Sequence, residues 1–145
     1  MIAFLRPDAW DAPVFIHVLG AMLLTAFVAT AVAALAAARA VSPADAILVR
    51  VGAWSLTAAV PSYVLMRGGA EWARSREPFP RDSEWIGIGY VVADGGALVL
   101  LAALALAWIA VRRTSTAAAR VAAALAAVIA AADVVAVWAM TTKPA

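Results

Sequence analysis

The sequence predicts an all-α membrane protein, a four-transmembrane-helix antiparallel bundle with both termini on the same side. Hydrophobic residues make up 66% of the chain and charged residues 14%, and the mean hydropathy is +0.95, which is outside the range of ordinary soluble domains. Crossing a bilayer takes about 20 apolar helical residues. Four stretches meet that length, at about residues 13–38, 46–66, 85–111 and 118–140, and together they form a single membrane domain over residues 1–145.

The first two spans are joined by a short link. Ser42 is suited to cap the helix that Pro43 begins, because serine accepts a bond from a free N–H group and proline has no N–H to leave unsatisfied. So short a link makes the two spans antiparallel neighbours. Within the second span, Pro61 cannot donate to the carbonyl of Thr57, so we expect a bend there and a hinge over residues 57–63.

A surface loop is predicted at residues 67–84. Gly68 and Gly69 are expected to end the second span, and Pro78 and Pro80 keep the following stretch from continuing as a helix. The fourth span is largely alanine and valine. Its small side chains let helix backbones approach closely, so we expect this helix to pack centrally in the bundle.

Ionisable residues inside the spans are the candidates for function, because charge is expensive in hydrocarbon. Counted at 1.5 Å of rise per residue, the two intramembrane aspartates of spans three and four lie roughly 10–14 Å below the interface on the side of the termini. One histidine and two tyrosines fall in the same half of the membrane. We therefore expect a polar cavity there, with the carboxylates close together and the Pro61 hinge beside it. The predicted ligand-binding residues are His17, Tyr63, Tyr90, Asp94 and Asp133.

A structural interpretation of the aspartates is left open. Each would then hydrogen-bond a neighbouring helix or pair with Arg67 or another arginine near the 67–84 loop. Arg50 lies near the opposite end of its span and is expected to reach the headgroups there.

Catalysis and metal binding are not expected. The chain has no cysteine and one histidine, so it lacks a thiolate site and a second histidine ligand for haem, and His17 would need a symmetry mate or Asp94 as co-ligand. Neither an HExxH motif nor a glycine-rich phosphate loop is present. We expect no enzyme activity, no cofactor, no metal and no nucleic-acid partner.

Orientation is predicted from the short loops. Residues 39–45 and 112–116 carry basic residues with almost no acid, whereas the terminal side mixes basic residues with acidic ones. Because basic residues near the spans favour the cytoplasm, the termini and the 67–84 loop are predicted to be extracytoplasmic.

Three short segments carry a family resemblance: residues 15–21 (FIHVLGA), 85–86 (WI) and 140–144 (MTTKP). With these and its layout of spans, the chain resembles the small four-helix bacterial integral membrane proteins grouped with uncharacterised, copper-resistance-D-like families. The resemblance implies a multi-pass protein of the bacterial plasma membrane with unassigned activity, and His17 is the polar position that carries over. Copper-handling relatives are expected to have several histidines and methionines, whereas this chain has one histidine and four methionines.

The sequence favours a small polytopic membrane protein whose polar intramembrane cavity binds or transports a small cation, a proton or a polar ligand. An alternative is a non-catalytic accessory or scaffold subunit of a larger membrane complex, which would use the alanine-rich faces and the 67–84 loop. A metal or haem redox protein is the third and least favoured class. The expected partners are the lipid bilayer and either further copies of the chain or a larger membrane protein.

Overall fold

The structure is a computed structural model that describes residues 12–38, 42–76 and 84–142. It has four helices: α1 (Ala12–Ala37), α2 (Pro43–Arg76), α3 (Glu84–Arg113) and α4 (Thr116–Thr142). Each is long and apolar enough to cross a membrane. The predicted set of four apolar helices is confirmed.

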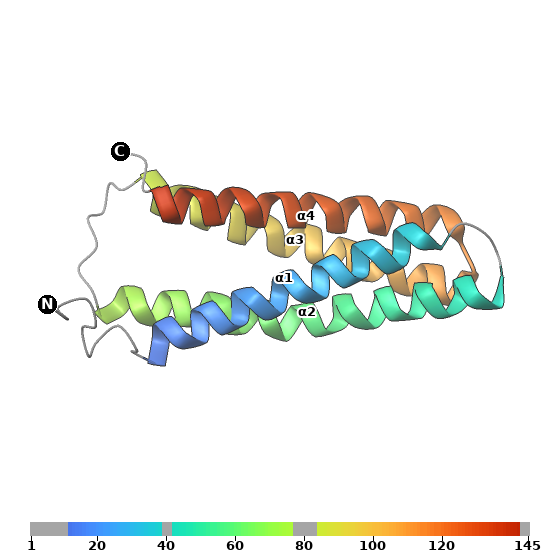
Figure 1. The fold of residues 1–145 in the computed structure, drawn as a ribbon, viewed down its shortest axis with the longest axis horizontal. Helices are drawn as coiled ribbons and strands as arrows, with labels where there is room; N and C mark the ends of the chain where they lie inside the picture. Colours follow the sequence, from blue (N-terminus) through green and yellow to red (C-terminus); the bar gives the residue numbers. More distant parts are fainter. Residues whose placement is uncertain (1–11, 39–41, 77–83, 143–145) are drawn as a thin grey trace, which may run out of the picture.

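The helices form two layers that lie lengthwise against each other (Figure 1). The first layer is α1 with α2, and the second is α3 with α4; we call them the first and second hairpins. In Figure 1, α1 and α3 run from left to right, and α2 and α4 return. The starts of α1 and α3 therefore lie at the same end as the last turns of α2 and α4. We call this the open end of the bundle, and the other the closed end.

Side-chain caps define the helix ends at the closed end. The N–H of Asp45 donates to Ser42 Oγ over 3.1 Å, so Ser42 caps α2 as predicted. Ser115 caps α4 in the same way, accepting a bond of 3.2 Å from the N–H of Ala118. Between α3 and α4, Thr114 adopts a left-handed conformation with φ 47°, and the N–H of Ser115 bonds to Ala110 O. That pair of features closes α3 as a Schellman motif.

The prediction that residues 67–84 form a surface loop is wrong for residues 67–76, which continue α2 to Arg76. Gly68 and Gly69 do not end the helix. A Cβ on Gly69 would lie 2.8 Å from His17 Cα, so the glycine lies where α1 and α2 approach closely. Gly20 plays the same part on α1, because a Cβ there would lie 2.7 Å from Met66 Cα.

Residues 77–83 lie outside the described part. The other three helices begin and end within two residues of the predicted bounds.

A core of small side chains joins all four helices from the middle of the bundle to the closed end. Alanine dominates it, and the larger buried members are Leu24, Val28, Leu35, Leu56, Leu100 and Ile129. Among residues 86–113 of α3, the buried residues begin at Leu100, so residues 86–98 take no part in the core. Because alanine lets helix backbones approach, the hairpins are tightly joined here, and they are less so at the open end.

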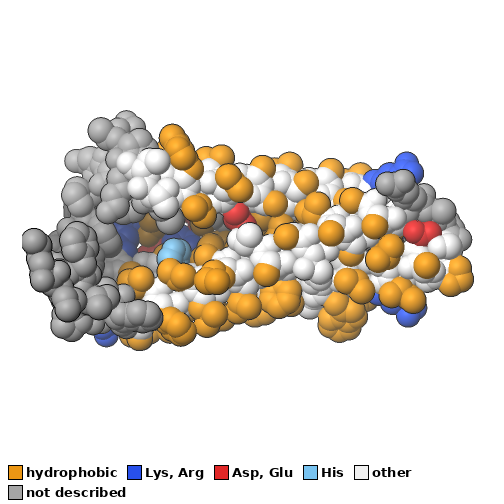
Figure 2. Space-filling view, in the orientation of Figure 1, with side chains coloured by type: hydrophobic (Ala, Val, Ile, Leu, Met, Phe, Trp, Pro, Cys, Tyr) orange, Lys and Arg blue, Asp and Glu red, His pale blue; other side chains and the backbone are white. Residues whose placement is uncertain are grey.

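The outward faces of the helices are also apolar. Val91, Leu98 and Val134 are 69–74% exposed, and large hydrophobic side chains cover much of the face shown in Figure 2. A soluble monomer rarely exposes contiguous apolar surface on this scale, whereas a helix surrounded by lipid does. The four apolar helices therefore match a chain whose outer surface contacts hydrocarbon.

Candidate functional site

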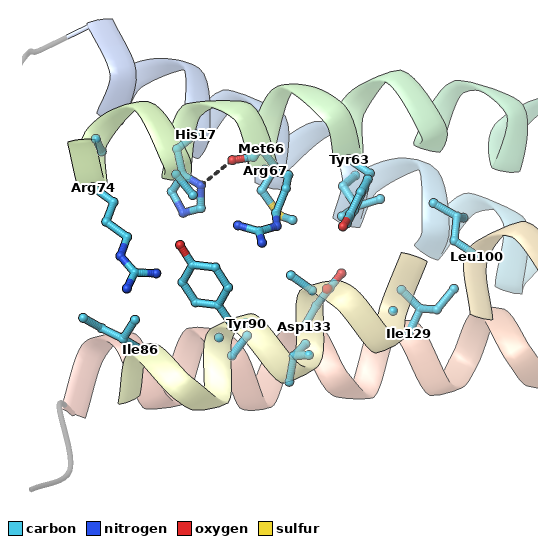
Figure 3. A pocket seen from close by; sticks show the side chains of 18 of the residues that line it. His17, Tyr63, Met66, Arg67, Arg74, Ile86, Tyr90, Leu100, Ile129 and Asp133 are labelled. Carbon is cyan, nitrogen blue, oxygen red and sulfur yellow. Dashed lines mark hydrogen bonds between the residues drawn. The ribbon is translucent and has the colours of Figure 1, made fainter. Parts of the chain in front are cut away.

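A cavity of about 300 Å³ lies between the two hairpins at the open end. Figure 2 shows the hollow between the layers, with basic and histidine side chains inside it. Figure 3 shows the residues around it, which come from all four helices. Most of its walls are apolar, formed by residues such as Val14, Leu24, Ile86, Leu100 and Ile129. Its polar lining residues are His17, Tyr63, Arg67, Arg74, Tyr90 and Asp133.

His17 is held in place by the backbone of α2. Its Nδ1 lies 2.8 Å from the carbonyl oxygen of Met66. A carbonyl accepts only, so Nδ1 carries the proton and donates it. The contact depends on the close approach of α1 and α2 at Gly20 and Gly69. The ring is thereby fixed as part of the cavity wall, with its Nε2 atom outside this bond.

Arg67, Glu71, Tyr90 and Asp94 form a polar network that joins the hairpins. Arg67 of α2 makes an ion pair with Glu71 one turn later, and its Nη2 lies 3.3 Å from Asp94 Oδ1 on α3. The hydroxyl of Tyr90 donates to Glu71 Oε1 over 2.7 Å. The guanidinium carbon of Arg67 lies 4.3 Å from the centroid of the Tyr90 ring, a favourable cation–π distance. Two polar links therefore cross from α2 to α3 beside the cavity.

Arg74 presents a second guanidinium to the same tyrosine. Its central carbon lies 4.9 Å from the Tyr90 ring centroid. In Figure 3, the side chains of Arg67 and Arg74 extend from α2 toward the second hairpin, and the hydroxyl of Tyr90 points back toward the first. In the described part of the chain, both ion pairs involve Arg67, so no carboxylate lies within 4.0 Å of Arg74.

The two aspartates are placed differently from each other. Asp133 lines the cavity and accepts a hydrogen bond of 3.5 Å from Thr25 Oγ1 of α1. Asp94 is not among the lining residues; its side chain is 63% exposed and faces Arg67. The two carboxylates have partners on different helices, and their expected approach to each other stays a prediction. Asp94 fits the structural interpretation of the aspartates, in which one of them pairs with Arg67.

Tyr63 lines the cavity and packs against the core, two residues from Pro61. Pro61 itself is exposed, and α2 continues as one helix across it (Figure 1). The hinge at Pro61 stays a prediction. Arg50 is exposed on α2 toward the closed end, away from this cavity.

Sequence reasoning considered Arg67 only as a possible partner of an aspartate and missed Glu71 and Arg74 as site residues, because it assigned all three to a loop. Their spacing contained the signal: residues i, i+4 and i+7 share one face of a helix, and an arginine–glutamate pair at i, i+4 stabilises it. The signal applies only if the helix continues through Gly68 and Gly69. The helix continues there because Gly69 packs closely against His17 of α1.

The donor set of the cavity suits an organic ligand better than a metal ion. Over the described ranges, no three His, Cys, Asp or Glu side chains come together as a metal site. The cavity offers guanidinium and hydroxyl groups beside apolar walls, which is the usual make-up of a small-molecule site. No known protein family, curated protein or solved structure matches this chain. The resemblance to copper-resistance-D-like proteins therefore stays a prediction.

Proposed function

We propose that this chain is a multi-pass membrane protein that binds a small amphipathic molecule in the cavity between its hairpins. The helices would cross the bilayer as an antiparallel bundle, with both termini on the same side. Support for the membrane setting comes from the four long apolar helices and their apolar outward faces. The surrounding bilayer would then supply the ligand.

The observation that carries this proposal is the make-up of the cavity. Apolar side chains from four helices surround about 300 Å³, and the polar groups are few. Pockets with apolar walls and a few placed polar groups bind small organic molecules, with the walls supplying affinity and the polar groups orientation. A cation held between two carboxylates is less well supported, because Arg67 already pairs with Asp94.

Binding is proposed ahead of transport because the packed core separates the cavity from the closed end of the bundle. The alanine core joins all four helices from the middle to the closed end. A pathway through the chain would have to part that core, whereas a ligand reaches the cavity without disturbing it.

The test uses the absence of cysteine from the chain. Ala93→Cys puts a thiol in the cavity wall, and Val91→Cys puts one on the outward face of the same helix, where the native side chain is 74% exposed. With the protein in phosphatidylcholine nanodiscs, the rate of alkylation by N-ethylmaleimide is measured against added dodecanol. We expect dodecanol to slow alkylation at Ala93→Cys with saturation and to leave Val91→Cys unchanged.

Two neighbouring glycines provide a matched control. A Cβ on Gly95 or on Gly96 would meet nothing within 4 Å, but only Gly96 lines the cavity. Gly96→Leu should fill the space and abolish protection by dodecanol, whereas Gly95→Leu should preserve it. Equal behaviour of these two variants, or no protection at all, would overturn the proposal and favour the accessory-subunit alternative.

A further inference from the structure

We infer that the cavity selects single-chain amphiphiles with an anionic headgroup, and that Arg74 binds that headgroup. This inference rests on the proposed function and names its ligand class. The tail would lie along the apolar wall, past Ile86 and Ala93 toward Leu100 and Ile129.

Charge is distributed unevenly around the cavity. Arg67 and Arg74 both line it, whereas Glu71 and Asp94, the carboxylates that pair with Arg67, do not. The arginines therefore contribute to the cavity lining, whereas the carboxylates that pair with Arg67 do not.

Arg74 is the group with unused binding capacity. Arg67 is engaged by two carboxylates, while the described residues place none within 4.0 Å of Arg74. Tyr90 contacts its guanidinium through the ring and through the hydroxyl, and a guanidinium has five N–H donors, so further donors are left for a ligand. Guanidinium binds carboxylate and phosphate oxygens through paired N–H groups, so an anionic headgroup is the natural partner.

The arrangement also separates a headgroup region from a tail region. On α2, Arg74 and Tyr63 both line the cavity and are separated by roughly 16 Å of helix, at 1.5 Å per residue. Figure 3 places Arg74 at one end of the cavity, and Leu100 and Ile129 at the other. This length suits an extended alkyl chain with its headgroup at the open end. Asp133 lies between these ends and already accepts a bond from Thr25.

The experiment compares three probes with the same tail: dodecyl phosphate, dodecyltrimethylammonium and dodecanol. Each is added to the Ala93→Cys protein in phosphatidylcholine nanodiscs at matched mole fractions, and protection from N-ethylmaleimide gives an apparent affinity. We expect dodecyl phosphate to bind about tenfold more tightly than dodecanol, as befits one charge-assisted contact. Arg74→Gln should remove this preference, and Arg74→Lys should restore part of it.

Arg76→Gln is the matched control. Arg76 is exposed two residues further along α2, contacts the Trp72 ring and does not line the cavity. Its replacement changes the net charge equally and should leave all three affinities unchanged. A loss equal to that of Arg74→Gln would show a general surface-charge effect and overturn the inference.

The remaining outcomes separate this inference from the proposed function. Equal protection by all three probes would retain the cavity as an amphiphile site and overturn its preference for anions. Tighter binding of dodecyltrimethylammonium, lost in Asp133→Asn, would assign a cation site instead. Protection by none of the probes would overturn the proposed function itself.

Discussion

Tyr90 of α3 donates its hydroxyl to Glu71 of α2 over 2.7 Å, and this bond joins the two hairpins beside the cavity. The ion pair between Arg67 and Asp94 joins the same two helices. Across the bundle, the contact of Thr25 with Asp133 links α1 to α4. The hairpins are thus connected by two polar links toward the open end, beyond the alanine core, and by the Thr25–Asp133 contact at the edge of that core.

Removing the Tyr90 hydroxyl should loosen the open end. Tyr90→Phe keeps the ring between the arginines but loses a bond worth about 0.5–1.5 kcal/mol. We expect alkylation at Ala93→Cys to become several-fold faster in this background, measured without added ligand. Tyr63→Phe removes a hydroxyl from the same cavity and leaves the Tyr90–Glu71 bond in place, so its rate should stay close to that of the parent. Identical rates for the two variants would mean that the bond does not control access.

Gly68 and Gly69, which are neighbours in α2, should respond oppositely to alanine. Gly69→Ala puts a Cβ 2.8 Å from His17 Cα and should destabilise the protein by about 1–3 kcal/mol, because backbone atoms must move apart. Gly68→Ala meets nothing within 4 Å and should stabilise it by about 0.5–1 kcal/mol through helix propensity. Unfolding temperatures in detergent measure both effects. A stabilising Gly69→Ala would show that α1 and α2 are not so closely packed.

Replacing Pro61 tests the predicted hinge. Pro61→Ala restores a donor for the Thr57 carbonyl and removes no buried packing, because the proline is exposed. The unfolding temperature should stay the same or rise. The corresponding gain in the free energy of unfolding is up to about 3 kcal/mol. If the proline bends α2 and positions Tyr63, protection of Ala93→Cys by dodecanol should weaken. Unchanged protection would leave Pro61 as a tolerated residue with no part in the site.

Orientation can be tested with single cysteines at exposed positions near the two ends. Ser75→Cys lies in the last turn of α2 and Ala117→Cys in the first turn of α4. Because the short loops are basic and nearly free of acid, we expect the first position outside and the second in the cytoplasm. A membrane-impermeant maleimide added to intact cells should label Ser75→Cys and spare Ala117→Cys. The reverse labelling would invert the orientation.

Sequence alone determined the features that depend on composition and length. Four apolar stretches long enough for a bilayer became four helices, and the cap at Ser42 followed from local chemistry. Counting helical rise also placed His17, Tyr63, Tyr90 and Asp133 at similar depths, and all four line one cavity. These properties are set by the residues of each segment and need no knowledge of its neighbours.

Only the tertiary structure decided which face each helix turns toward the cavity and where α2 ends. Depth placed Asp94 with the other candidates, but the rotation of α3 turns it to Arg67 and away from the lining. Gly68 and Gly69 have the composition of a helix end, yet α2 continues because Gly69 packs against the backbone of α1. That continuation brings Arg67, Glu71 and Arg74 to the site. Helix rotation and glycine packing depend on contacts between segments far apart in the chain, which the local pattern of any one segment does not contain.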